Sequence, residues 1–327
     1  MNMRITTAAL ALLAASVSAL AEVKLNDNFS VSGYVVGSYK NWKPSGSPSN
    51  DEYSWDAMKT AFTATFKPVT GVVSLYYPYN DGTGKKVKLL DAYATVDVGQ
   101  GFSVTAGNFL SYLGYEAFDP INMTQMTYGA PTSGPLFAIP AYHTGAKLDF
   151  GSATNSFGIA ALDSVYNGPN IVRGDGEIKH NAGFEGYYKN TATKNLTLWA
   201  GFAYDTKGQK SIHPDKVLTL DFWAEYKVDD KSTVAAELAN YDGGTMGKGT
   251  MWLAYYGYAF TENTSCAFRV SGTSLGSGTA GSDYLQYTVC PTYKISKNFS
   301  MRAEYSYYDY KTGGTSSFFG VQALFQF

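Results

Sequence analysis

The chain has 327 residues, of which 45% are hydrophobic and only 16% charged, with 27 Tyr, 19 Phe, 5 Trp, 34 Gly and a net charge of −2. Many aromatics and little charge exclude a disordered chain, and the slightly acidic balance excludes a typical nucleic-acid-binding protein. Two cysteines cannot build a disulfide framework, and no apolar run beyond the N-terminus reaches the roughly 20 residues of a membrane-spanning helix.

The first 21 residues have the layout of a secretory signal peptide. Arg4 supplies a basic start, residues 8–15 form an uncharged apolar stretch, and Ala19 and Ala21 have the small side chains of a cleavage site. The alternative is a short anchor helix, which the interspersed Thr and Ser residues disfavour. We therefore expect export, cleavage after Ala21, and a mature domain of residues 22–327.

The mature chain alternates with period two. Leu218, Leu220 and Phe222, for example, share one face of an extended segment. Thr219 and Asp221 share the other face, because successive side chains of a strand point to opposite sides. The pattern predicts sixteen strands, at 29–40, 53–66, 70–80, 87–97, 102–110, 141–150, 155–164, 179–189, 195–205, 215–228, 231–241, 249–260, 264–273, 283–295, 297–309 and 316–327.

The connections between these strands alternate between short turns and longer loops. Seven are short and eight tend to be longer and rich in Gly, Pro, Ser and Asn, as an antiparallel barrel with an even strand number requires. Short periplasmic turns, long outer loops and strands of about 10 residues are typical of outer-membrane barrels. The sequence thus predicts an all-β transmembrane antiparallel β-barrel of about 16 strands, with 14–18 compatible.

A soluble β-sandwich or propeller is the alternative fold. Its strands would be shorter, about 5–6 residues, and would lack aromatic residues at their ends. In this chain tyrosines cluster at strand ends, as at 76–79 and 255–258, and such rings suit a membrane interface. The C-terminal strand ends in Phe327, which resembles the assembly signal of Gram-negative outer-membrane barrels.

The stretch 107–148 carries the most specific pattern in the chain. It resembles the OmpL-like outer-membrane β-barrel porin family of Gram-negative bacteria, in which a glycine-rich strand leads into Gly-x-Glu and a Pro-x-x-His/Thr-x-Gly run begins the next strand. The resemblance implies a channel-type barrel without naming a solute. The residues that carry it are Gly107, Phe109, Gly114, Glu116, Asn122, Pro140, His143 and Gly145.

The loop at 111–140 is the longest connection of the predicted barrel, and its apolar residues argue against disorder. It is the third long loop, the position at which general porins fold a loop inward. We expect it to fold into the barrel and to bring Glu116 and Asp119 into the lumen as a pore constriction. The alternative is a lid packed over the outer mouth.

Charged residues on the polar face give the expected chemistry of the lumen wall. Positive and negative side chains nearly balance, so strong charge selectivity is not expected. Most of these charges are interpreted as solvated groups of the lumen. The predicted wall residues are Lys40, Lys59, Lys147, Lys189, Lys227, Arg269, Lys294 and Arg302, with Asp91, Asp149, Glu185, Asp221, Glu225, Glu237 and Glu304.

Other functions leave weaker traces in the sequence. Trp199 and Trp223 share the polar face and could stack on sugars. The three histidines, His143, His180 and His213, lack a local nucleophile motif, and no His/Cys cluster has metal-ligand spacing, so no enzyme, cofactor or metal site is expected.

Cys266 and Cys290 lie on opposite faces of their predicted strands, so we expect two free thiols.

The sequence as a whole predicts an outer-membrane porin that admits small hydrophilic solutes by passive diffusion. Its expected partners are outer-membrane lipid, the barrel-assembly machinery and the solutes, while a homotrimer is compatible with the sequence but has no visible signature. The alternative function is a structural or surface-interaction barrel whose pore is closed.

Overall fold

The computed structural model describes residues 22–78, 87–129, 140–166, 182–206, 215–276 and 283–327. The predicted signal peptide lies outside this part of the chain. Among the described residues no helix is long and apolar enough to cross a membrane.

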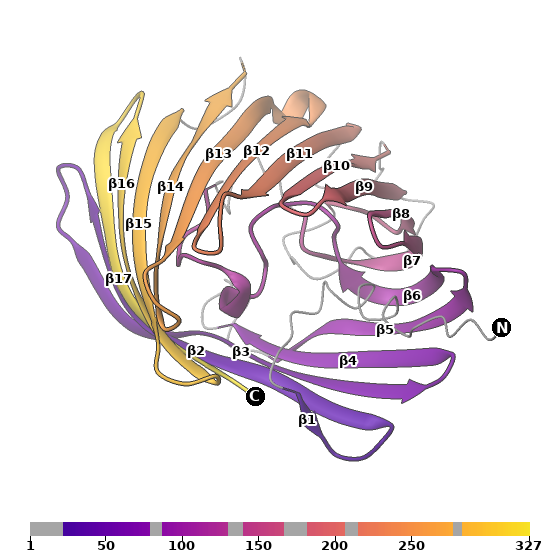
Figure 1. Cartoon of the computed structure of the whole chain (residues 1–327). Helices are drawn as coiled ribbons and strands as arrows, with labels where there is room; N and C mark the ends of the chain where they lie inside the picture. The colour runs from indigo at the N-terminus through magenta and orange to yellow at the C-terminus, as the bar shows by residue number, and fades with distance from the viewer. Residues whose placement is uncertain (1–21, 79–86, 130–139, 167–181, 207–214, 277–282) are drawn as a thin grey trace.

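The described strands form one closed antiparallel barrel (Figure 1). Sixteen long strands, β2 to β17, each pair with their sequence neighbours, and β17 pairs with β2 to close the ring. The short β1 adds to β2. The strands are β1 (Val23–Lys24), β2 (Phe29–Pro44), β3 (Asn50–Phe66), β4 (Val69–Pro78), β5 (Lys88–Gly99), β6 (Phe102–Leu110), β7 (Tyr142–Gly151), β8 (Asn155–Leu162), β9 (Gly183–Thr193), β10 (Leu196–Asp205), β11 (Val217–Lys227), β12 (Ser232–Asp242), β13 (Lys248–Ala259), β14 (Thr264–Leu275), β15 (Tyr284–Lys294), β16 (Phe299–Tyr310) and β17 (Gly314–Gln326).

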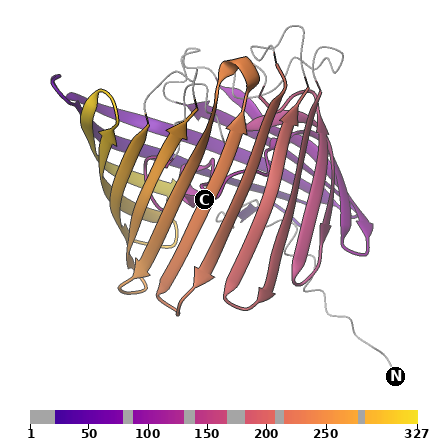
Figure 2. The same cartoon turned by 90° about the horizontal axis from the view of Figure 1, so that it is seen from above.

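The predicted fold is confirmed, including the strand number and the asymmetry of the two ends. Figure 2 shows tight hairpins at one end of the barrel. The connections at the other end span more residues, as between the end of β6 at Leu110 and the start of β7 at Tyr142. The alternation is also confirmed: on β11 the outward Leu218, Leu220 and Phe222 are exposed, whereas the inward Thr219 and Asp221 are buried. An apolar outer surface of this kind suits contact with lipid.

Three strands extend at least three residues beyond their predicted ends: β2 and β3 at their shared hairpin, and β9, which continues to Thr193. β2 continues to Pro44 and β3 begins at Asn50, so the hairpin extends to the pair Trp42 and Asn50. The prediction assigned residues 41–52 to a loop because they are rich in Pro, Ser, Gly and Asn. Pairing of the backbone continues there because a strand beyond the membrane no longer needs an apolar outer face.

Two glycines that face each other across β6 and β7 pack tightly against the next strands on either side, β5 and β8. Gly107 lies opposite Gly145 in the register, and Gly107 has φ +130°, a backbone conformation that L side chains rarely adopt. A Cβ at Gly107 would collide with the carbonyl oxygen of Ala92, and one at Gly145 with that of Ala161. Two glycines of the family-like stretch are therefore required by the packing of the strands that flank the long loop.

Replacing Gly107 by alanine is expected to lower the yield of folded barrel. The substitution adds backbone strain of about 1–3 kcal/mol and a steric clash with β5. Heat-modifiable mobility on gels measures the folded fraction. Gly71→Ala is the control, because its Cβ would meet only ordinary contacts, and equal yields of the two variants would contradict the prediction.

The register of β14 and β15 separates the two cysteines. Cys290 pairs with Ala267, and Cys266 pairs with Pro291, so the two side chains point to opposite faces. Both cysteines are free and buried.

Alkylation of the unfolded chain without a reductant should therefore modify both cysteines. Intact mass is the measurement, and a second sample reduced before alkylation is the control. A smaller mass increase in the unreduced sample would show that the thiols had been oxidised.

Candidate functional site

The loop after β6 is fastened to inward-facing side chains around much of the barrel. Its described part, Ser111–Gly129, contains the 3-10 helix η1 (Pro120–Asn122), which lies within the ring of strands in Figure 1. Hydrogen bonds connect this segment to side chains of β2, β3, β7, β9, β11, β12, β14 and β16. Residues 130–139 of the predicted loop lie outside the described part of the chain.

Wall carboxylates hold the first part of the segment through its backbone. The carboxylates of Glu185, Asp221 and Glu237 are buried, so each needs the hydrogen bonds that the loop amides supply. All three were predicted to lie on the lumen wall. The contacts are Tyr112 N to Glu185 Oε2 (3.1 Å), Gly114 N to Asp221 Oδ2 (2.9 Å) and Tyr115 N to Glu237 Oε1 (2.6 Å).

Two loop tyrosines bind further acidic residues of the wall. The Tyr112 hydroxyl donates to Asp149 Oδ1 at 2.7 Å, and the Tyr115 hydroxyl donates to Glu225 Oε2 at 3.0 Å. Burial, reinforced by the adjacent carboxylate, raises the pKa of both tyrosines well above the usual value, so both hydroxyls stay protonated. Lys147 Nζ lies 3.6 Å from Asp149 and 4.9 Å from the centre of the Tyr112 ring.

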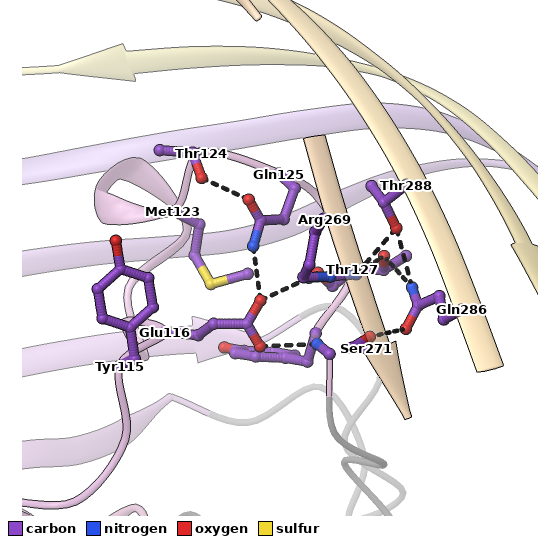
Figure 3. Close-up of polar contacts among 12 residues, drawn as sticks. Tyr115, Glu116, Met123, Thr124, Gln125, Thr127, Arg269, Ser271, Gln286 and Thr288 are labelled. Carbon is purple, nitrogen blue, oxygen red and sulfur yellow. Dashed lines mark hydrogen bonds and ion pairs between the residues drawn. The ribbon is translucent and has the colours of Figure 1, made fainter. Parts of the chain in front are cut away.

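Glu116 and Arg269 form a buried ion pair at the centre of the segment (Figure 3). Glu116 is 7% exposed and Arg269, on β14, is 2% exposed. The Glu116 carboxylate also accepts from Gln125 Nε2 and, at 2.7 Å, from the amide of Gly129. Arg269 donates to the carbonyl oxygen and the hydroxyl of Thr127. The pair and its hydrogen bonds thus attach two parts of the loop, at Glu116 and at residues 127–129, to β14.

Asp119 lies against a different part of the wall. It accepts from the Tyr34 hydroxyl of β2 at 2.7 Å and from Lys59 Nζ of β3 at 3.2 Å. Lys59 Nζ also lies 3.0 Å from Asp91 Oδ2. Glu116 and Asp119, predicted together as constriction residues, therefore contact separate strands.

β16 holds the part of the loop around η1. Arg302 donates to the carbonyl oxygens of Met123, at 2.6 Å, and of Pro120, at 3.1 Å. Glu304 accepts from the amide of Thr127 at 3.2 Å. The predicted wall residues Arg302 and Glu304 are both buried and both bind loop backbone.

Apolar contacts accompany these polar ones. Leu113 belongs to a buried cluster with Phe109 and Trp199, and Ile121 packs against a smaller cluster that includes Tyr34 and Val36. Apolar burial on the inner face of the barrel stabilises the docked loop.

The two predicted stacking residues lie next to each other. Trp199 and Trp223 are cross-strand partners, with ring centroids 5.8 Å apart and planes at 6°. Trp199 is 6% exposed, whereas Trp223 is partly exposed.

A second segment, which the sequence reasoning missed, docks beside the long loop. The amides of Val165 and Tyr166 donate to Asp205 Oδ1 and Oδ2 at 2.6 and 2.9 Å. Val165 and Tyr166 also join the apolar cluster of Leu113. Asp205 shares the polar face of β10 with Trp199, so the alternation of side chains along this strand could have identified Asp205 as an inward-facing residue.

Asp56 was also missed. A register shift between Val36 and Gly37 interrupts the alternation on β3, and Asp56 accepts from Ser38 Oγ at 2.8 Å and pairs with Lys40. No sequence signal marks such a bulge.

Comparison with solved structures finds the same fold. An anion-selective porin from Comamonas acidovorans is 11% identical, with a TM-score of 0.69 over 91% of this chain and 99% of that chain. The Salmonella typhi OmpF structure with daunomycin is 15% identical, with a TM-score of 0.66 over 94% and 100%. The channel DcaP of Acinetobacter baumannii is 12% identical, with a TM-score of 0.64 over 93% and 99%.

A search of curated protein sequences finds no significant match. Among the described residues no group of three or more His, Cys, Asp or Glu side chains is arranged to hold a metal ion. The family described as "Putative beta-barrel porin-2, OmpL-like" matches residues 53–327. The match covers most of the barrel, and so the chain belongs to this family of OmpL-like β-barrel porins.

Proposed function

We propose that this outer-membrane porin passes small hydrophilic solutes by passive diffusion through a lumen narrowed by Ser111–Gly129. The observation that carries the proposal is the attachment of this segment to strands around the barrel, centred on the Glu116–Arg269 pair. A sixteen-stranded barrel encloses a lumen wide enough for water, so a docked loop would set its narrowest point. These contacts favour a constriction over a lid at the outer mouth.

Weak charge selectivity is part of the proposal. Lys59, Arg269 and Arg302 are buried positive groups of the wall, and each contacts a carboxylate or loop carbonyls. Glu185 and Asp221 are occupied by loop amides. Charges compensated in this way create little net field in the lumen, so neither anions nor cations should be strongly preferred.

A closed barrel that acts through its surface is the second candidate. It is favoured by the complete burial of inward side chains such as Ser271, Gln286 and Ser306. An enzyme is a poorer candidate. Ser111 and His143 both lie near Glu185, but Ser111 Oγ donates to Glu185 at 2.6 Å and not to His143, so the two do not form a Ser–His nucleophile pair. His180 and His213 lie outside the described residues.

Conductance of the purified, folded protein in planar lipid bilayers tests the proposal. Discrete channel steps with similar permeability for small anions and cations are expected. Heat-modifiable mobility establishes that the sample is a folded barrel. A folded barrel without channel activity would overturn the proposal in favour of the closed barrel.

The assembly and targeting of the protein extend the proposal. We infer that residues 1–21 direct export and are removed after Ala21, and that the barrel-assembly machinery inserts the barrel into lipid. A trimer is proposed because a Vibrio cholerae OmpT structure of similar fold is described as a trimer form. The N-terminal sequence and the molecular mass of the purified protein test these points.

A further inference from the structure

Six aromatic side chains from the wall and the loop form a continuous row inside the barrel. The wall contributes four of them, from β9, β10, β11 and β13, and the loop contributes two. In order along the row they are Tyr112, Tyr187, Trp199, Trp223, Tyr115 and Tyr255, with successive ring centroids 4.6, 6.2, 5.8, 5.5 and 6.1 Å apart.

The rings of Tyr187, Trp199 and Trp223 have nearly the same orientation, with angles of 11° and 6° between neighbouring planes. A Cβ at Gly201 would collide with the Trp199 ring, and one at Gly158 would lie 2.7 Å from the Tyr187 ring. The Trp199 ring therefore lies close to the backbone of Gly201, and the Tyr187 ring lies close to that of Gly158.

Trp199 is buried beneath the loop, and the other five residues of the row are partly exposed. Acidic groups border the accessible rings: the Tyr115 hydroxyl binds Glu225, and the Tyr112 hydroxyl binds Asp149. Lys147 Nζ lies over the Tyr112 ring. The row thus combines partly exposed aromatic rings with carboxylate and ammonium groups in contact with them.

We propose that this row is a binding track for small carbohydrates. One face of a pyranose ring presents C–H groups that pack on an aromatic ring, while its equatorial hydroxyls bind carboxylates and ammonium groups at the edge. Strands of such barrels tilt by about 35–45° from the barrel axis. A row that crosses neighbouring strands therefore also extends along this axis, which is the direction of transport. The proposal rests on the porin function proposed above, because a track along the wall serves a solute that crosses the lumen.

Titration of the folded wild-type protein with maltotriose tests the track in two ways. In planar bilayers, saturable reduction of the ion current is expected, whereas sorbitol, an open-chain polyol, should not reduce it in a saturable manner. In detergent, a saturable change in tryptophan fluorescence is expected, and this measurement does not depend on conduction.

Trp223→Ala in the bilayer assay and Tyr187→Ala in both assays should raise the half-saturating maltotriose concentration roughly fivefold or more, which corresponds to the loss of about 1 kcal/mol of contact with one aromatic ring. Phe222→Ala is the matched control, because Phe222 is the outward neighbour of Trp223 and 48% exposed. Affinity unchanged by both variants, or no saturable fluorescence change in a folded wild-type barrel, would overturn the track. Sugar binding without ion current would instead overturn the proposed channel and leave the track standing.

Discussion

Replacing residues 117–128 by two glycines is expected to raise the single-channel conductance at least about twofold, because conductance follows the narrowest cross-section of a pore. The replacement removes η1 and every described contact of the loop with β2, β3 and β16. The excision is feasible because the flanking residues are adjacent: the Glu116 carboxylate accepts from the Gly129 amide at 2.7 Å.

A matched control replaces the exposed connection 45–49, between β2 and β3, by the same two glycines. That change should leave conductance unaltered, since the connection lies at the outer end of the hairpin and not on the lumen wall. Both proteins should retain heat-modifiable mobility, because the barrel is held by backbone pairing between strands. Unaltered conductance after removal of 117–128 would show that the segment does not limit the pore.

The sequence was sufficient to predict the barrel because one physical rule repeats along every strand. Lipid on one side and a polar interior on the other impose a period of two on each strand. The outward position of Phe222 and the inward position of Asp221 could therefore be assigned without a structure. The same rule placed Cys266 and Cys290 on opposite faces. It failed where lipid contact ends, at the outer ends of β2 and β3, where a bulge shifts the alternation near Asp56, and at the end of β9, which continues to Thr193.

The partners of the wall charges could not be predicted in the same way. The sequence indicated that Glu304 faces inward, but its hydrogen bond to Thr127 joins residues far apart in the chain. Periodicity defines the face of a strand, not which loop residue reaches it. Six of the fifteen charges interpreted as solvated lumen groups instead bind loop backbone, as the Glu185 and Arg302 contacts illustrate.

Arg269→Ala is expected to release the loop while leaving the barrel folded. The change leaves the Glu116 carboxylate buried without its cation and removes the donor to the Thr127 carbonyl oxygen. Breaking a buried ion pair by removing one partner costs about 3–5 kcal/mol. The loss of free energy destabilises the docked loop and not the pairing of the strands, so the segment should open locally. Faster amide hydrogen exchange in residues 116–129 and higher, noisier conductance are the expected readouts.

Two further variants separate the ion pair from simple loss of side-chain volume. Glu116→Gln keeps an acceptor for Arg269 and should loosen the loop less than Arg269→Ala does. Arg269→Met combined with Glu116→Leu replaces the pair with apolar groups, an exchange that often costs little in a buried site, and should protect the loop amides better than Arg269→Ala alone. If Arg269→Ala left exchange in residues 116–129 as slow as in the wild type, the pair would not be what fastens the loop. The many other contacts along Ser111–Gly129 would then suffice without it.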